Sequence, residues 1–166
     1  MNRFVARIAQ RTPRPSPEAE ALLRESAVAW LSTTSADGMP AVVPVWFLWD
    51  GESFLVFSKP HARKVRNIAQ NPRVMLAIGE PEDDFDVQLV EGRAALVPAR
   101  DVDALLAIVA TKYRRWLAGI GLGLDEFAAT YAQPIRITPT RFLPWRGRTW
   151  NGQSARLAPS LVGAPA

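Results

Sequence analysis

The run of residues 39 to 49, MPAVVPVWFLW, is apolar at almost every position. In an extended strand, alternate side chains point to opposite faces, so a sheet with one face in water alternates apolar and polar residues. Here the even-numbered side chains from Val42 to Leu48 are as apolar as the odd-numbered ones from Val43 to Trp49. We therefore expect the core of the chain to cover one face and a second subunit to cover the other, with room for a flat ligand between them.

Length and composition are those of one compact domain. The chain has 166 residues, of which 48% are hydrophobic, which is enough for one sizeable core and too little for two. It contains no cysteine and a single histidine, which excludes disulfides, thiolate chemistry and a histidine-rich metal site. No run of roughly 18 apolar residues predicts a membrane span, and the first residues lack the apolar block of a secretory signal. The expected location is the cytoplasm.

The net charge of +4 leaves three classes of partner open: nucleic acid, a membrane surface or a phosphorylated ligand. The tryptophans lie mainly in apolar runs rather than among the cations, whereas nucleic-acid surfaces combine basic and stacking side chains. We expect a phosphate-bearing small molecule as the partner, and neither nucleic acid nor a membrane.

Hydrophobic periodicity and turn residues predict an α+β barrel with peripheral helices rather than a parallel sheet. Ser16, Pro17 and Glu18 carry the capping hydroxyl, the N1 proline and the acid that begin a helix, which we expect to run to about Glu25. Six antiparallel strands are expected over residues 27–34, 39–49, 53–58, 73–78, 87–97 and 134–143, and three further helices over 60–70, 99–117 and 124–131. The first three strands are expected to form a meander, because tight-turn residues separate them.

Two elements carry more detailed expectations. Apolar residues of the strand over 87–97 change from odd to even positions, which predicts a β-bulge near Glu91–Gly92, where a glycine tolerates an extra residue. The helix over 99–117 should bury one apolar side, formed by Val102, Leu105, Leu106, Val109 and Trp116. At the level of domains, we expect a basic extension over 1–15, one domain over 16–150 and a mobile tail over 151–166.

Four cations follow the third expected strand within eight residues: Lys59, Arg63, Lys64 and Arg66. Cations at a helix N-terminus are electrostatically unfavourable, because the helix dipole and the free backbone N–H groups attract anions. The cluster therefore favours a bound phosphate, to which Ser58 could donate a hydroxyl, Lys64 a point charge and Arg63 a fork of two donors. The alternative is a set of solvated surface charges.

The order and spacing of these segments resemble the flavin-binding split barrels of the pyridoxamine 5'-phosphate oxidase superfamily. The likeness is carried by Lys64 with Asn71-Pro72 after a gap of six residues, by Phe57-Ser58 at a strand end, and by the run VEGRA that begins at Val90. The stretches SADGMPAVVPVWFLWDGESF and SKPHARKVRNIAQNPRV are more similar to the branch that uses the deazaflavin F-420. The resemblance covers residues 20 to 145.

This resemblance implies a homodimeric, six-stranded antiparallel split β-barrel with two cofactor sites at the subunit interface. It implies an oxidoreductase that transfers a hydride to a small organic acceptor, with F-420 as the cofactor and FMN as the alternative. The implied cofactor-binding positions comprise a phosphate group with its neighbours and a strand along the ring system: Phe57, Ser58, Lys59, Arg63 and Lys64 for the first, and Val42, Pro44, Val45 and Trp46 for the second.

Some roles remain open between two interpretations. Trp46 and Trp145 are candidate walls of the acceptor pocket, although buried tryptophans also serve in core or dimer packing. His61 is a candidate proton donor, with a structural role as the alternative. No pair of nucleophile and base is visible in the sequence, so no catalytic residue is assigned.

The chain also departs from the family pattern. Oxidases of the family place basic side chains on the second strand, where this chain has Val42 and Phe47. This argues against the oxidation of pyridoxamine phosphate and favours the deazaflavin over FMN. A non-catalytic flavin or haem storage protein of the same fold would share every motif described and remains the alternative function.

Overall fold

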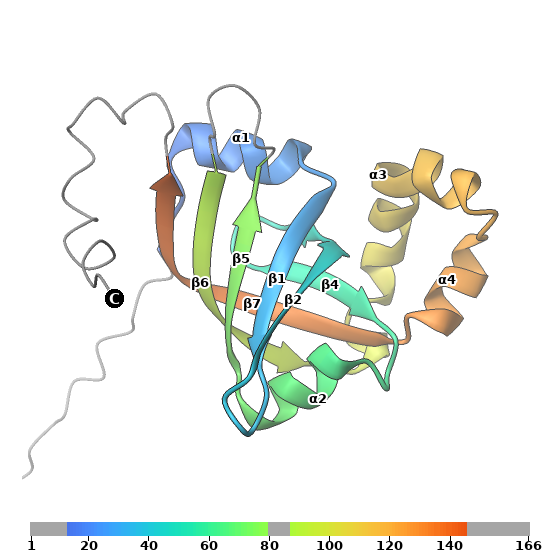
Figure 1. The fold of residues 1–166 in the computed structure, drawn as a ribbon. Helices are drawn as coiled ribbons and strands as arrows, with labels where there is room; N and C mark the ends of the chain where they lie inside the picture. Colours follow the sequence, from blue (N-terminus) through green and yellow to red (C-terminus); the bar gives the residue numbers. More distant parts are fainter. Residues whose placement is uncertain (1–12, 80–86, 146–166) are drawn as a thin grey trace, which may run out of the picture.

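The computed structural model describes residues 13–79 and 87–145, which form a curled antiparallel sheet with helices around it (Figure 1). The strands are β1 (Val28–Thr34), β2 (Pro40–Trp46), β3 (Leu48–Trp49), β4 (Phe54–Ser58), β5 (Arg73–Ile78), β6 (Val87–Leu96) and β7 (Gln133–Trp145). The helices are α1 (Pro17–Glu25), α2 (Arg63–Gln70), α3 (Leu106–Gly119) and α4 (Leu124–Thr130). Within these ranges no helix is long and apolar enough to cross a membrane. Apart from residues 13–15, the expected basic extension and the expected tail lie outside the described residues.

The sheet has the strand order β2-β1-β5-β6-β7-β4-β3, with all neighbours antiparallel. The described residues form seven strands where six were expected, because the run predicted as one strand divides at Phe47. Its first part, β2, pairs with β1, and its second part, β3, pairs with β4 at the opposite end of the order. The expected meander of three strands is therefore wrong. Since consecutive residues occupy the two ends of the sheet, the sheet curls as in a barrel.

Hydrogen bonds from α3 hold the chain where it changes from β2 to β3. The backbone N–H of Phe47 donates to the Tyr113 hydroxyl over 2.9 Å, and that hydroxyl lies 2.7 Å from the carbonyl oxygens of both Phe47 and Ala27. The Lys112 ammonium also donates to the Phe47 carbonyl over 3.2 Å. The backbone groups of Phe47 thus find partners on α3, as buried polar groups require.

Two apolar clusters lie on opposite sides of the curled sheet. Inside the curl, residues such as Leu31, Phe54 and Ile137 are fully buried, and α1 adds Leu23. A second cluster joins β3 and β4 to α3 and α4 through Leu48, Leu55, Val109, Tyr113, Leu117 and Phe127. Each large apolar side chain buried in this way contributes about 1.5 to 3 kcal/mol, so the pair α3–α4 is attached mainly by this second cluster.

Two of the four described helices, α2 and α3, begin later than expected. Ser16 caps α1 as predicted, since its hydroxyl accepts from the Ala19 N–H over 3.2 Å. By contrast, α2 begins at Arg63, so Pro60 and His61 lie in the turn before it. Two short 3₁₀ turns, Ala99–Asp101 and Asp103–Leu105, precede α3.

The buried side of α3 also differs from the prediction. Trp116 is 51% exposed, whereas Tyr113 and Leu117 are buried in its place, next to Val109. The sequence pattern therefore correctly predicted a helix with one buried apolar side. It wrongly assigned Trp116 to that side in place of Tyr113 and Leu117.

The β-bulge predicted near Glu91–Gly92 is confirmed, but its reason is different. Glu91 pairs with Arg141 and Gly92 with Pro139, so the extra residue is Thr140 on β7. The strand β6 keeps its parity from Gln88 to Ala94, where the even-numbered residues are buried, and its pairing to β5 is uninterrupted. The apparent change of parity in the sequence was thus misleading.

Gly92 is instead required by the close approach of β7. A Cβ at this position would lie 2.8 Å from Cγ2 of Ile137 and 3.1 Å from the Thr138 carbonyl oxygen. Gly119, at the end of α3, has no atom within 4 Å of the corresponding point.

The side chains on the two faces of β2 differ in their exposure to solvent in the single chain. Val45 is buried, but Val42 is 57% exposed, and Pro44 is exposed beside its partner on β1, Trp30, which is 52% exposed. One face of the strand therefore packs in the core, and the apolar side chains of the other form an open surface.

The contacts of Gly92 generate a prediction for Gly92→Ala. The added methyl group must displace Ile137 or the β7 backbone, so we expect a loss of about 1 to 3 kcal/mol in the free energy of unfolding. Gly119→Ala is the matched control and should change stability by less than about 0.5 kcal/mol, or increase it slightly. Urea unfolding of both variants measures this. Equal stabilities for the two variants would contradict the packing described here.

Lys112 generates a prediction about pH. Burial lowers the pKa of its ammonium to about 8 from the ordinary 10.5. Below pH 8 the folded chain carries the full cost of the buried charge, and this cost disappears as pH rises through the interval between the two values. The stability of the wild type relative to Lys112→Met should therefore rise across this interval in urea unfolding experiments. If the free energies of unfolding of the wild type and of Lys112→Met changed in parallel with pH, Lys112 would keep its ordinary pKa.

Candidate functional site

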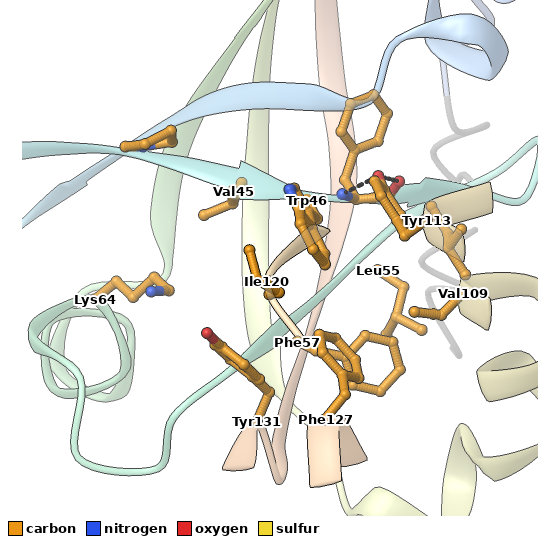
Figure 2. Close-up of a pocket in the computed structure, with 13 residues that line it drawn as sticks. Val45, Trp46, Leu55, Phe57, Lys64, Val109, Tyr113, Ile120, Phe127 and Tyr131 are labelled. Atoms are coloured by element: carbon orange, nitrogen blue, oxygen red, sulfur yellow. Dashed lines mark hydrogen bonds between the residues drawn. The ribbon is translucent and has the colours of Figure 1, made fainter. Parts of the chain in front are cut away.

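A cavity of about 180 Å³ lies between the end of β2, the strand β4, the first turn of α2 and the pair α3–α4 (Figure 2). Six of its lining residues are aromatic: Trp46, Phe47, Phe57, Tyr113, Phe127 and Tyr131. Lys64 is the cation among its lining residues. The cavity therefore combines flat apolar walls with a single positive charge.

Trp46 is held by the helices at the last position of β2. Its ring stacks on Tyr113 with centroids 4.7 Å apart and an angle of 6° between the planes. The centroid of the Phe127 ring lies 6.1 Å from that of Trp46, with 18° between the planes. The Trp116 ring packs edge to face, with its centroid 6.3 Å away. Stacked contacts of this kind add about 0.5 to 1.5 kcal/mol each beyond the burial of area. The orientation of Trp46 is thus determined by α3 and α4.

The opposite wall joins β4 to α4. Phe57, near the end of β4, contacts Phe127 edge to face at 5.8 Å, and Phe127 stacks on Tyr131 at 4.9 Å. The Lys59 ammonium lies 5.8 Å from the centroid of the Tyr131 ring. A continuous aromatic surface therefore extends from Trp46 to Tyr131.

Lys64 reaches this space from the first turn of α2. Its side chain is half-buried, and burial lowers the pKa of its ammonium. None of the ion pairs formed by the described residues includes it. Figure 2 shows its amino end and the Tyr131 hydroxyl turned toward one another. A desolvated ammonium without a counter-ion attracts an anionic ligand.

The other predicted phosphate-binding residues lie outside the cavity. The Ser58 side chain is fully buried, and its hydroxyl donates to the Lys59 carbonyl over 3.2 Å. Lys59 and Arg63 are exposed on the loop and at the start of α2. Of the basic residues predicted there, Lys64 is thus the one that reaches the cavity.

Only some of the residues predicted on the second strand, and only one of the two predicted tryptophans, line the aromatic cavity. Pro44, Val45 and Trp46 line the cavity, while Val42 points to the exposed face. Trp145 borders a different cavity, of about 370 Å³, between α1 and the ends of β6 and β7. Within one chain, the structure does not bring Trp46 and Trp145 together.

His61 does not line the aromatic cavity. It is exposed in the turn before α2, and its carbonyl accepts a hydrogen bond from Arg66 over 2.6 Å. The backbone of His61, rather than its ring, takes part in the contacts of this turn.

Sequence reasoning missed the residues that α3 and α4 contribute. These are Val109, Tyr113, Ile120, Phe127 and Tyr131. One signal was available, because Phe127 and Tyr131 are four residues apart and therefore lie on the same side of an expected helix. No local pattern shows that this side meets the end of β2.

Comparisons with known proteins identify the family. The sequence profile described as pyridoxamine 5'-phosphate oxidase matches residues 15–146. Among solved structures, an F420 reductase is 30% identical with a TM-score of 0.58, over 75% of this chain and 94% of that one. A search among curated protein sequences finds no match.

Two more distant structures share the fold. A FAD-binding protein from Mesorhizobium loti is 20% identical with a TM-score of 0.62, over 80% of this chain and 95% of that one. HutZ, a haem storage protein from Vibrio cholerae, is 23% identical with a TM-score of 0.60, over 81% and 95%.

The profile match spans every helix and strand of the described residues and all residues of the aromatic cavity. The F420 reductase matches over almost its whole length. The chain therefore belongs to the pyridoxamine 5'-phosphate oxidase family, with structural relatives that include an F420 reductase.

Proposed function

We propose that the chain is an oxidoreductase that binds a flavin-type cofactor at the start of α2 and along β2, and that transfers a hydride to a small organic acceptor. The observation that carries this proposal is the half-buried Lys64 ammonium, which has no ion-pair partner among the described residues and faces an aromatic cavity. The likeness to an F420 reductase supports the deazaflavin F-420 as the cofactor, with FMN as the alternative.

The negatively charged group of the cofactor is assigned to the cations around the start of α2. Lys64 supplies a partly desolvated positive charge. An ion pair with a phosphate would offset the free-energy cost of desolvating the ammonium. Arg63 and Lys59 are exposed nearby and free to turn toward the same anion. In this proposal the Ser58 hydroxyl must leave the Lys59 carbonyl before it can donate to the phosphate.

The ring system of the cofactor is assigned to β2. This strand is at one end of the sheet order and pairs with β1 alone among the described strands. Its other edge therefore offers unpaired backbone N–H and C=O groups, which suit the polar edge of a flavin-type ring. Pro44 itself has a backbone carbonyl but no N–H to offer.

A bound flavin-type cofactor supplies the hydride chemistry itself. The chain itself positions the cofactor and the acceptor and excludes water from the space between them. Trp46 is oriented by Tyr113 and Phe127, so it offers a rigid flat surface beside the assigned ring position. A surface of this kind can hold an acceptor at the short distance that hydride transfer needs.

A second copy of the chain is the proposed cover for the open face of β1 and β2. Trp30, Val42 and Pro44 form an apolar surface there, and isolated soluble domains seldom leave such surfaces uncovered. A symmetric homodimer would bury this surface and close the cofactor site from outside.

The charge reversal Lys64→Glu tests the cofactor assignment. It removes a charge-assisted interaction worth about 1.5 to 3 kcal/mol, so F-420 should bind roughly tenfold more weakly or worse. Arg73→Glu is the matched control: it makes the same change in net charge at an exposed position on β5, outside the cavity lining. Fluorescence titration of both variants with F-420 and with FMN measures the effect.

Equal dissociation constants for wild type and Lys64→Glu would contradict the proposed site. If both substitutions weaken binding to the same extent, the effect is one of overall charge and the site is elsewhere. The loaded wild type, once reduced and mixed with a quinone or nitroaromatic acceptor, should be reoxidised through turnover. Retention of the cofactor without turnover would instead identify a storage protein.

The dimer assignment predicts a mass of about twice 18.3 kDa in light scattering at micromolar concentration. Val42→Arg places a charge in the proposed interface and should produce a monomer. Ile108→Arg makes a similar change at an exposed apolar position on α3 and should leave the dimer intact. A monomeric wild type, or a dimeric Val42→Arg variant, would contradict the assignment.

A further inference from the structure

The first turn of α2 contains little that stabilises it locally. Its N-cap residue, Ala62, makes no side-chain hydrogen bond to the free N–H groups, and the turn contains no acidic residue. Arg63 and Lys64 stand there instead, where the helix dipole disfavours cations. The position of α2, and with it that of Lys64, must therefore depend on contacts with the sheet.

Three side chains of α2 are buried, Val65, Asn67 and Ile68, and the helix packs against β1 and β6 (Figure 1). Val65 and Ile68 belong to the apolar cluster inside the curl. Apolar burial is non-directional, so these two side chains hold the helix on the sheet but determine its rotation less sharply than a hydrogen bond would.

Among the described residues, Asn67 makes the one hydrogen bond that joins a side chain of α2 to the sheet. Its Nδ2 group donates to the Thr33 hydroxyl over 3.0 Å. Asn67 is 4% exposed and Thr33 is 2% exposed, so water cannot easily replace either partner. Because a buried polar group left without a partner is costly, the pair favours one rotation of α2 about its axis.

This hydrogen bond connects the two parts of the proposed cofactor site. Lys64 precedes Asn67 by three residues, less than one helical turn, so the two side chains turn together with the helix. Thr33 pairs with Ala41 in the ladder between β1 and β2, next to the residues assigned to the cofactor ring, which begin at Val42. The separation between the Lys64 ammonium and β2 therefore depends on the contact between Asn67 and Thr33.

We propose that Asn67 is a positioning residue: its hydrogen bond to Thr33 keeps the Lys64 ammonium at the distance from β2 that a ligand with both an anionic group and a flat ring requires. The need for that distance rests on the proposed function, whereas the control of Lys64 by Asn67 does not. Neither Asn67 nor Thr33 lines the aromatic cavity, so both act through Lys64.

The test uses a double variant, Thr33→Val with Asn67→Leu, that removes both polar groups together. Since no buried group is left without its partner, the double variant should stay close to the wild type in stability. Thr33→Ser keeps the hydroxyl and is the conservative variant. Ile68→Val is the matched control, because it weakens the packing of a neighbouring buried residue of α2 and retains the hydrogen bond.

The first measurement needs no cofactor. Burial lowers the pKa of the Lys64 ammonium, so this pKa shows how far the side chain is held out of water. NMR titration of the lysine side chains, with Lys64→Arg to assign the signal, should show the Lys64 pKa rising toward the ordinary 10.5 in the double variant. Thr33→Ser and Ile68→Val should leave it unchanged. Tyr113 and Tyr131, the other titratable residues of the cavity lining, are present in every variant.

The second measurement compares ligands with and without the anionic group: F-420 with its deazaflavin riboside fragment, and FMN with riboflavin. The wild type and Thr33→Ser should bind the phosphate-bearing member of a pair more tightly. In the double variant this preference should fall about fivefold or more, while the phosphate-free member keeps its affinity within about twofold. A merely structural role of Asn67 would weaken both members alike.

Circular dichroism confirms that each variant folds. If the double variant does not fold, Asn67→Ala takes its place with the same two measurements and the same expected results.

The proposal is overturned by a Lys64 pKa that is equal in the wild type and the double variant, by an equal rise in Ile68→Val, or by an unchanged preference for the phosphate-bearing ligand. If the Lys64 pKa rises as expected while no cofactor binds the wild type, the positioning role stands and the proposed function fails. If a cofactor binds the wild type and the double variant behaves like it in both measurements, the proposed function stands and the positioning role fails.

Discussion

The hydrogen bonds between Tyr113 and the backbone of Phe47 connect the two halves of this structure. They hold the chain at the point where it passes from one end of the sheet order to the other, which is what curls the sheet. Because Tyr113 also stacks on Trp46, the same side chain that holds this joint orients the neighbouring wall of the cavity. The junction between β2 and β3 and the orientation of Trp46 therefore share one side chain of α3, Tyr113.

The arrangement divides the candidate site into two parts along β2. The unpaired edge and the exposed apolar face of β2 suit a large flat cofactor and a second subunit. Behind Trp46, the pair α3–α4 lines the aromatic cavity of about 180 Å³. Lys64 reaches that cavity from α2, and its charge is the one proposed to meet the anionic group of the cofactor.

The sequence predicted those features that depend on neighbouring residues. The cap at Ser16, the end of α2 at Asn71 and most strand positions follow from local chemistry and are confirmed. The division of the second strand at Phe47 was missed, because its cause is a hydroxyl 66 residues away. The cation cluster predicted Lys64 as a ligand contact from neighbouring residues alone. The aromatic side chains opposite Lys64 come from distant helices, so no local pattern indicated them. The family follows from the profile match over residues 15–146.

The most direct test is a crystal structure of the chain grown with F-420. We expect an acidic group of the cofactor within hydrogen-bond distance of the Lys64 ammonium, the cofactor ring along β2, and a second copy of the chain over Val42. Cofactor density at another surface, with solvent alone at the start of α2, would contradict this expectation.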